Sequence, residues 1–314
     1  YRIFKKGKYD IVQYSTPNAA LYASLASRMA EVPVRVYGQW GIRYVGFNGI
    51  KRRIFRLLEK ITCFNSTHIR SVSRLNRQFG IDEGLYPESK VKVIGNGGTI
   101  GVDLNDYKIE NKEVWKNEVR NVLKIPADAF VYCFCGRVSA DKGSSELIQA
   151  FRSLAERHPE AHLMLIGGIE RNHGINEDLI SWAQNNKNVH FCGRVKMDQI
   201  THYYSAADVL VHPTYREGFG MVIQEAGAMG IPVITTRIPG AGEVMEEGVS
   251  CLLVSPRNTD MLSQAMLRLI EAPEFVKEMG QSAYDRTSKL YSRPIMLANQ
   301  MEDYSDLFQQ AYAK

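Results

Sequence analysis

Short apolar runs and segments with helical apolar spacing alternate along most of the chain. The runs rich in Val, Ile and Leu that we predict as strands in the second half are 130–138, 161–166, 189–192, 209–212, 232–235 and 251–254. The helices predicted around them are 144–157, 177–185, 196–204, 220–229, 242–247 and 258–270. This alternation is typical of an α/β protein with parallel sheets covered by helices on both faces.

The first hundred residues follow the same pattern at less regular spacing. Strands are predicted at 9–14, 32–37, 67–73 and 90–94, with helices at 18–30, at 49–64 and from Ser73 onward. The Gly- and Asn-rich stretch 95–107 is predicted as a hinge, and a last helix as starting near Pro294. A chain of 314 residues suits two domains of ordinary size, which we predict at 1–107 and 108–293. The chain opens on the end of a helix at Tyr1, so we expect a further part of the first domain upstream.

Composition favours a globular protein of the cytoplasm. Hydrophobic residues make up 45% of the chain, which is enough to build sizeable cores. No apolar run approaches the roughly 18–20 residues that cross a bilayer, and we expect no signal peptide. The five cysteines are odd in number and lack metal-ligand spacing, so we expect reduced thiols.

Positive charge is concentrated near the start of the chain. Residues 1–80 hold 15 Lys and Arg but only 3 Asp and Glu, although the whole chain has a net charge of only +5. Such a segment favours an acidic partner, either nucleic acid or an anionic membrane surface. Nucleic acid binding would call for a recognisable reader motif, which is absent, so we expect no nucleic acid partner.

One predicted helix gathers much of this charge. Its apolar residues fall on one stripe, and the rest of its surface is largely basic. The stripe consists of Ile50, Ile54, Leu57, Leu58 and Ile61, and the cations are Lys51, Arg52, Arg53, Arg56 and Lys60. We interpret these cations as a membrane-surface patch that would dock the protein peripherally on the inner face of a membrane. The alternative is an ordinary surface helix with a solvated basic face.

Two acids frame the most informative stretch of the chain. Glu217 precedes Gly218-Phe219-Gly220-Met221, and Glu225 lies inside the helix that follows. A buried strand, a Gly-rich turn and a helix N-terminus make a site for an anion, because backbone N–H groups and the helix dipole point at it. Acids beside an anion site suit hydroxyl groups, so we predict a nucleotide sugar as ligand. The structural alternative is that Glu217 caps the helix and that Glu225 is an ordinary residue on the face of the helix.

Two cations are predicted near the same edge of the sheet. The strand 130–138 ends in Gly136-Arg137, and Lys142 lies just before the next helix. Together they could hold a diphosphate and neutralise its charge as it leaves. Gly193-Arg194-Val195 follows another strand, where a Gly lets the backbone approach a flat base. His212, close to the acids, is expected to have a core or loop role rather than a catalytic one.

These motifs together resemble the donor-binding half of the retaining GT-B glycosyltransferases, group 1 or family 4 type. The resemblance extends over 9–290 and is greatest to bacterial enzymes that build capsule and related surface polysaccharides. It is carried by Gly136-Arg137 with Lys142-Gly143, by 213–220, and by Glu225-Ala226 with 230–234. It implies two facing Rossmann-like domains, with the helix 294–314 returning to the first domain.

The resemblance also implies roles for individual residues. Arg137 and Lys142 would grip the diphosphate, and Glu217 would lie close to the transferred sugar. Donor-binding residues would be Gly136, Arg194, Val195, Gly218, Phe219, Gly220, Met221 and Glu225. The donor would be a nucleotide sugar, with UDP as the expected nucleotide. The acceptor would be a polyprenyl-diphosphate-linked glycan or an oligosaccharide.

The chain departs from the family pattern on the acceptor side, and its sequence shows no metal-binding motif. Relatives carry a His-Gly near the transferred sugar, where this chain has Gly38-Gln39-Trp40-Gly41, so we predict acceptor-side roles for Gln39 and Trp40. No Asp-x-Asp stands in a metal-binding context, and we expect no cofactor and no obligatory metal.

Two other functions remain open at this point. A GT-B epimerase or phosphorylase would share the fold but turn over without a sugar acceptor. A basic nucleic-acid- or membrane-binding module without catalysis would leave the pair Glu217 and Glu225 unexplained.

Overall fold

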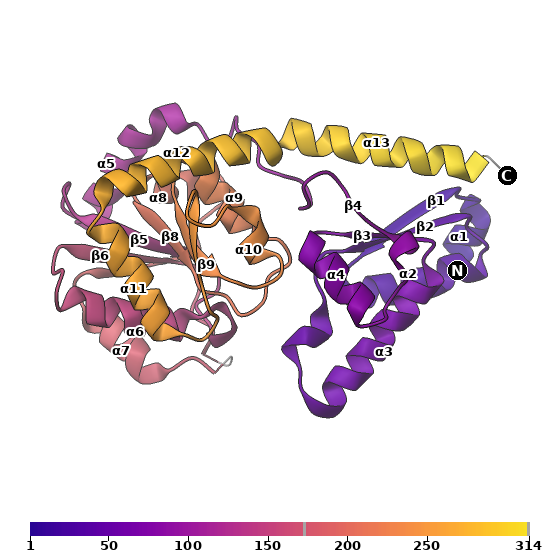
Figure 1. Cartoon of the computed structure of the whole chain (residues 1–314), viewed down its shortest axis with the longest axis horizontal. Helices are drawn as coiled ribbons and strands as arrows, with labels where there is room; N and C mark the ends of the chain where they lie inside the picture. The colour runs from indigo at the N-terminus through magenta and orange to yellow at the C-terminus, as the bar shows by residue number, and fades with distance from the viewer. Residues whose placement is uncertain (172–173, 313–314) are drawn as a thin grey trace. The chain divides into compact units, whose positions relative to one another are not determined.

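The chain folds into two compact units in the computed structural model, which describes residues 1–171 and 174–312 (Figure 1). The first unit comprises Tyr1–Ile100 and Pro294–Lys314, and the second comprises Gly101–Arg293.

The first unit is built on a four-stranded parallel sheet with the order β1-β2-β3-β4. Its strands are β1 (Ile11–Ser15), β2 (Val34–Gln39), β3 (His68–Ser71) and β4 (Val91–Val93). Its helices are α1 (Arg2–Gly7), α2 (Pro17–Met29), α3 (Gly49–Asn65), α4 (Arg74–Asp82) and α13 (Arg293–Tyr312).

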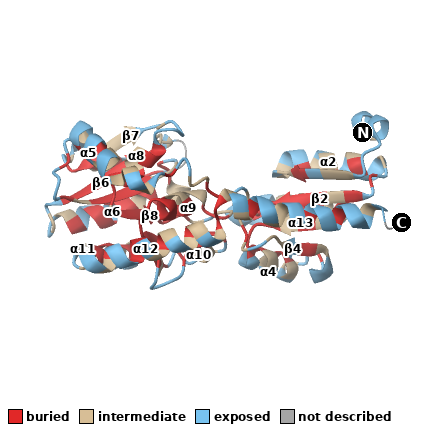
Figure 2. Ribbon diagram, turned by 90° about the horizontal axis from the view of Figure 1, so that it is seen from above, coloured by how far each residue is buried: buried red, intermediate tan, exposed pale blue. Residues whose placement is uncertain are grey.

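Helices cover both faces of this sheet. Helices α2 and α3 pack side by side, and their unit has a core around Tyr14, Tyr37 and Ile69. Leu307 of α13 packs on Val34 and Val36, whose side chains point to the other face. Figure 2 shows α13 lying along β2, with buried strands between helices whose outer sides are exposed.

The second unit is built on a six-stranded parallel sheet with the order β10-β9-β8-β5-β6-β7. Its strands are β5 (Phe130–Cys135), β6 (Ala161–Ile166), β7 (Val189–Gly193), β8 (Val209–His212), β9 (Val233–Thr236) and β10 (Cys251–Val254). Its helices are α5 (Lys112–Leu123), α6 (Ser144–Ala155), α7 (Glu177–Asn185), α8 (Ile200–Ser205), α9 (Met221–Ala228), α10 (Ala241–Val244), α11 (Thr259–Ile270) and α12 (Pro273–Leu290).

The order of these strands alone indicates where a ligand would bind. From β5 the chain moves outward through β6 and β7, and it then returns to β8 on the other side of β5. Strands β5 and β8 are therefore neighbours at the point where the order reverses, with Tyr132 opposite Val209. Open α/β sheets bind ligands at the carboxyl ends of the strands at such a point.

The prediction of parallel sheets covered by helices on both faces is confirmed. The boundary between the units falls at Gly101, whereas the sequence predicts it after residue 107. The reason is that Val102 exchanges backbone hydrogen bonds of 2.8 Å with Tyr291 and Arg293, which ties 101–107 to the end of the second unit.

Helix α12 was not predicted. Pro273 occupies its first turn, where a missing N–H costs nothing, and Val276, Met279, Ala283 and Thr287 form its buried side. Within 1–171 and 174–312, none of the helices combines the length and the apolar character that crossing a bilayer demands.

Candidate functional site

The predicted donor residues of the second unit gather where β5 and β8 end. Gly136 and Arg137 follow β5 directly, and Lys142 lies just before α6. Glu217 lies in the loop between β8 and α9, and Glu225 is in the second turn of α9. The strand order reverses at this edge of the sheet. The two acids and the two cations therefore lie on different elements that end or begin in one region.

Lys142, Glu217 and His212 form one hydrogen-bonded cluster. The Nζ of Lys142 lies 2.7 Å from Oε2 of Glu217, and Nε2 of His212 lies 3.1 Å from the same oxygen. The backbone N–H of Gly218 donates to the other carboxylate oxygen at 3.2 Å. The carboxylate of Glu217 is thereby fixed by three donors, of which Lys142 is the charged one.

These contacts decide the charge of each member of the cluster. Burial alone would raise the pKa of Glu217, but the His212 hydrogen bond and the Lys142 charge outweigh it and lower the pKa to about 2. Burial lowers the pKa of His212, against the opposing effect of Glu217, so the imidazole is neutral. Because an ionised carboxylate only accepts, Nε2 of His212 carries the proton. Glu217 is therefore an anion at neutral pH.

Glu225 is held in a different environment. The hydroxyl of Tyr204 donates to Oε2 of Glu225 at 2.9 Å, and the hydroxyl of Tyr107 bonds the same carboxyl group. Burial raises the pKa of Glu225 despite these two donors. The protein thus keeps a carboxylate where its charge is disfavoured, which is a cost that a ligand with hydroxyl groups could offset.

Arg137 forms ion pairs with two acids in this structure. Its guanidinium lies 2.7 Å from Glu170 and 3.1 Å from Asp141, and 43% of its side chain is exposed. The hydrogen bond that Arg137 donates to Glu170 raises the pKa of Arg137, so the side chain stays charged. Like Lys142, which pairs with Glu217, Arg137 would have to share or exchange partners to contact a diphosphate.

The Gly-rich turn before α9 is shaped by close backbone packing. Gly220 has a φ of +66°, a conformation that favours glycine. A Cβ on Gly240 would lie 2.3 Å from the carbonyl oxygen of Gly218, so position 240 must stay small for the turn to sit where it does. The ring of Phe219 is buried against Tyr291, and Phe219 can therefore offer a ligand only its backbone. Met221 is the first residue of α9.

Arg194 and Val195 follow β7, at the outer edge of the sheet. Gly193 has a φ of +64°, and the chain turns there. Arg194 is exposed, and its side chain lies against Gly168 at the end of β6. Their predicted place beside the base stays a prediction.

The two acceptor-side candidates of the first unit have different surroundings. Gln39 is fully buried, and its amide donates to Glu59 at 2.7 Å while accepting from Tyr86 at 2.8 Å. The prediction of an acceptor-side role for the Gln39 side chain is therefore wrong, because both its polar groups are used inside the core. Trp40 is 49% exposed and lines a cavity of about 250 Å³ with Arg70 and Gln300.

Sequence reasoning missed the partners of the two acids. His212, for which the sequence predicts a core or loop role, is a hydrogen-bond donor to Glu217. Tyr204 and Tyr107 reach Glu225 from 21 and 118 positions away in the chain, so no local pattern marks them. Among the described residues, no three His, Cys, Asp or Glu side chains come together as a possible metal site.

Known glycosyltransferases are similar to this chain in sequence. The chain is 29% identical over 312 residues to the capsular polysaccharide biosynthesis glycosyltransferase CapM of Staphylococcus aureus, covering 99% of this chain and 80% of that protein. An uncharacterized glycosyltransferase of Methanocaldococcus jannaschii is 29% identical over 237 residues, which cover 75% of this chain and 59% of that protein.

Two solved structures share the fold. HepE of Anabaena in complex with UDP has a TM-score of 0.81 and 23% identity, with 97% of this chain and 80% of HepE covered. The sucrose-phosphate synthase of Thermosynechococcus elongatus has a TM-score of 0.83 and 21% identity, with 98% and 76% covered. Both support the GT-B fold. The model of the family described as glycosyl transferases group 1 matches residues 116–286, more than half of the chain. The chain therefore belongs to the group 1 glycosyltransferases.

Proposed function

We propose that this protein is a retaining glycosyltransferase that moves a sugar from a UDP-linked donor to a lipid-linked glycan or an oligosaccharide in cell-surface polysaccharide biosynthesis. The observation that carries the proposal is the cluster of Lys142, Glu217 and His212 beside Glu225, at the strand-order reversal of the second unit. The relative CapM is named for capsular polysaccharide biosynthesis, and structures of HepE contain UDP and UDP-glucose, which supports the donor and the pathway class.

Each residue of the site would have a distinct task. Glu225 accepts hydrogen bonds from the ribose hydroxyls. Lys142, Arg137 and the N-terminus of α9 meet the negative charge that develops on the diphosphate as it leaves. Glu217, held as an anion by Lys142 and His212, lies where positive charge develops on the sugar ring. Arg194 and Val195 border the base.

The reaction would proceed on one face of the sugar. The bond between the anomeric carbon and the diphosphate oxygen breaks, and the acceptor oxygen bonds to the same face, which retains the configuration. The acceptor proton passes to the departing phosphate, so no side chain has to act as general base, and the same-face attack needs no enzyme nucleophile. The acceptor would be a polyprenyl-diphosphate-linked glycan or an oligosaccharide.

We place the reaction in the cytoplasm, on the inner face of the membrane. Five free cysteines, Cys63, Cys133, Cys135, Cys192 and Cys251, support a reducing compartment.

UDP should stabilise the protein more than other nucleoside diphosphates do. At 100 times its dissociation constant, a ligand of the folded state adds ~2.7 kcal/mol, which corresponds to roughly 5–10 °C in melting temperature. Thermal-shift assays with UDP, GDP, ADP and dTDP and their sugars check this. Equal shifts with all four would contradict a base-specific site, and a larger shift with another base would replace UDP as the donor nucleotide.

Turnover should not depend on a divalent metal. The positive charges of Lys142 and Arg137 and the dipole of α9 supply the electrostatic role that a metal plays in other enzymes. We expect the rate of UDP release to stay within twofold after dialysis against EDTA. A loss of activity that Mg²⁺ or Mn²⁺ restores would contradict metal independence.

A further inference from the structure

The start and the end of the second unit are joined by hydrogen bonds. The chain enters this unit at residue 101 and leaves it after Arg293. The N–H of Val102 donates to the carbonyl of Tyr291, and the N–H of Arg293 donates to the carbonyl of Val102, each at 2.8 Å. The guanidinium of Arg293 also pairs with Asp103 at 2.9 Å. We call residues 101–107, at the start of the second unit, the junction segment.

A tight turn fixes the end of the junction segment. The backbone N–H of Asn105 donates to Oδ1 of Asp103 at 3.1 Å. The N–H groups of Asp106 and Tyr107 donate to the carbonyl of Asp103 at 2.9 and 3.3 Å. An Asp side chain that accepts from the backbone two residues further on stabilises such a turn. The side chain of Tyr107 is only 8% exposed, so the turn directs its ring into the interior of the second unit.

The junction segment is connected to two of the predicted donor-binding residues. The hydroxyl of Tyr107 forms a hydrogen bond with the carboxyl group of Glu225. Tyr291, which bonds Val102, packs its ring edge-on against Phe219, with the ring centroids 5.5 Å apart. A change at Glu225 or at Phe219 therefore acts on the junction segment.

Two tyrosine hydroxyls use part of the hydrogen-bonding capacity of Glu225. Tyr204 of α8 donates at 2.9 Å, and Tyr107 approaches from the junction segment. Burial and the charge of Glu225 raise the pKa of Tyr107, so its hydroxyl keeps its proton and donates. An ionised carboxylate has about four acceptor positions, of which these two donors occupy two. The positions that are left match the two hydroxyls of a ribose.

We propose that Tyr107 is a positioning residue for the nucleotide: its hydroxyl holds the carboxylate of Glu225 in the orientation that accepts both ribose hydroxyls. The inference rests on the proposed function, because it takes Glu225 as the residue that binds the ribose. Since coupling between two contacts is reciprocal, a bound ribonucleotide also stabilises the contact of Tyr107 with Glu225, and with it the junction segment. A structural role, in which the ring of Tyr107 only fills the interior, predicts neither effect.

Tyr107→Phe tests the hydroxyl, because it keeps the ring. Calorimetry compares UDP with 2′-deoxy-UDP, which lacks one of the two ribose hydroxyls. We expect the parent to bind UDP about tenfold more tightly than 2′-deoxy-UDP, since the deoxy nucleotide loses a hydrogen bond to a charged group. In Tyr107→Phe the affinity for UDP should fall about fivefold and that for 2′-deoxy-UDP less than about twofold, because a carboxylate held by one tyrosine no longer meets both hydroxyls. Tyr204 still donates to Glu225, so the variant should fold, which its melting temperature checks.

Hydrogen exchange measures the reciprocal effect on the junction segment. In the parent, UDP should slow the exchange of the backbone N–H groups of Asn105, Asp106 and Tyr107, because the bound ribose stabilises the contact between Tyr107 and Glu225. In Tyr107→Phe, at equal saturation with UDP, most of this slowing should be lost.

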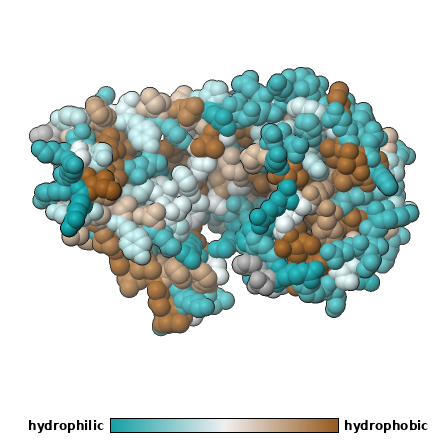
Figure 3. All heavy atoms as spheres, turned by 180° about the vertical axis from the view of Figure 1, so that it is seen from behind, coloured by the Kyte–Doolittle hydropathy of each residue, from teal (hydrophilic) through white to brown (hydrophobic). Residues whose placement is uncertain are grey.

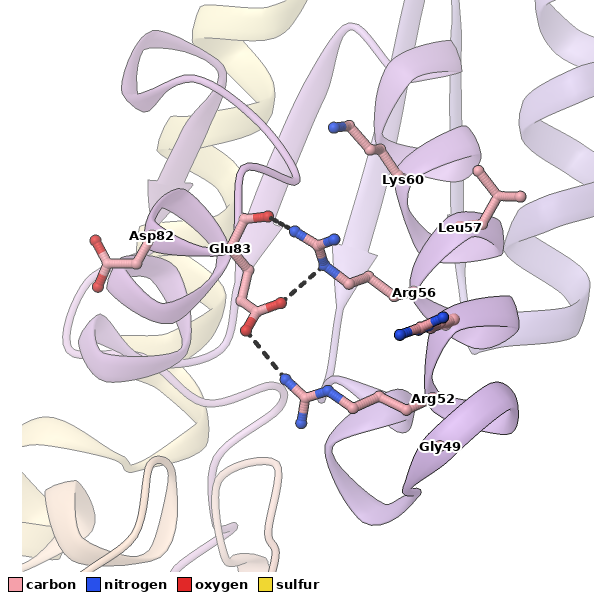
Figure 4. A pocket seen from close by; sticks show the side chains of 8 residues that line it. Gly49, Arg52, Arg56, Leu57, Lys60, Asp82 and Glu83 are labelled. Carbon is pink, nitrogen blue, oxygen red and sulfur yellow. Dashed lines mark hydrogen bonds and ion pairs between the residues drawn. The ribbon is translucent and has the colours of Figure 1, made fainter.

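Tyr44→Phe is a matched control in the first unit. Tyr44 is fully buried and donates to Oε2 of Glu83 at 3.3 Å. Arg52 and Arg56 lie 3.0 and 2.8 Å from the same carboxylate, as Figure 4 shows. Both arginines are thus paired within the unit, and the membrane-surface role predicted for them is corrected. Because Glu83 keeps two partners without the hydroxyl, Tyr44→Phe should fold and bind both nucleotides as the parent does.

The surface of the first unit sets one condition for these titrations. Apolar side chains gather at the lower left of Figure 3, on the unit that carries α3. Because exposed apolar groups favour association, the parent and both variants should be compared at one protein concentration at which the parent is monomeric.

The outcomes separate the role of Tyr107 from the proposed function. A parent that does not distinguish UDP from 2′-deoxy-UDP would overturn the ribose role of Glu225, and the role of Tyr107 with it. A parent that distinguishes them, together with a Tyr107→Phe variant that keeps the same preference, would overturn the positioning role alone. Equal slowing of exchange by UDP in the parent and in Tyr107→Phe would overturn the coupling to the junction segment.

Discussion

Replacing Lys142 with Ala should lower kcat by roughly 10²–10³-fold, the loss that follows removal of one preorganised donor from an active site. Lys142 is the cation that lies 2.7 Å from Glu217 at the carboxyl ends of the central strands. In the proposed reaction it stabilises the charge on the leaving diphosphate, which is greatest in the transition state. Nucleotide release from saturating donor and acceptor gives kcat, and calorimetry gives the affinity for UDP.

The pH dependence distinguishes this role from a structural one. Lys142 helps to lower the pKa of Glu217 to about 2, so removing it should let burial raise that pKa. If activity needs the Glu217 anion, the acid limb of the pH profile then moves to higher pH in Lys142→Ala. His212 and the Gly218 N–H still bind the carboxylate, so we expect the variant to fold.

Two variants control the Lys142 result. Lys142→Arg should recover part of the rate, because the charge is kept while its geometry changes. Lys277→Ala, at a side chain that is 72% exposed on α12, should leave kcat unchanged. Parental kcat in Lys142→Ala would remove this residue from the proposed mechanism.

The α/β fold could be predicted because buried strands leave a continuous apolar signal. Strands β6, β8 and β10 are runs rich in Val, Ile and Leu, and β5 consists of aromatic, Val and Cys residues. The sequence does not predict helix α12, because the helix begins at a proline and buries small or polar residues such as Gly280 and Thr287 together with Met279. It packs against α9 and α11, and these tertiary contacts cannot be read from the local sequence.

The sequence predicts which residues lie at this edge of the sheet, but it does not predict which side chains pair with one another there. The sequence places Lys142, Glu217 and Glu225 after buried strands, and strand ends of a parallel sheet share one edge. Which cation pairs with which acid depends on strand order and side-chain geometry. Arg137 and Lys142 look equivalent in sequence, yet Arg137 pairs with Glu170 and Asp141, and Lys142 pairs with Glu217.

The orientation of α3 was also beyond the sequence. An apolar stripe beside basic residues fits both a packed helix and a membrane anchor, so the sequence alone leaves both interpretations open. Burial of Glu59 decides how the helix faces the core, and it depends on Gln39 and Tyr37, two residues of β2. The same contact explains why Gln39 is unavailable to an acceptor.

Glu225→Ala should weaken binding of UDP roughly 10–100-fold. In the proposed complex the Glu225 carboxylate accepts hydrogen bonds from the ribose, and a hydrogen bond to a charged group contributes ~1.5–3 kcal/mol. Titration calorimetry measures the loss directly. Glu271→Ala, at a side chain that is 53% exposed, should bind UDP with parental affinity.

Glu225→Gln separates the ligand role of this residue from its role in the fold. Burial raises the pKa of Glu225, which means that the folded state disfavours its ionised form. A carboxyl group with a raised pKa in the folded state stabilises the fold below its unfolded pKa, and that contribution is lost as pH rises through the folded value. At neutral pH the ionised group is therefore a cost, and a neutral amide that still accepts from Tyr204 should raise the melting temperature of the free protein.

The same variant, Glu225→Gln, should show a smaller shift in melting temperature with UDP than the parent does. A lower melting temperature would mean that the fold needs the carboxylate, and a parental UDP shift would mean that the ribose is bound elsewhere. A more stable but weaker-binding variant is expected only if the buried charge is kept for the ligand.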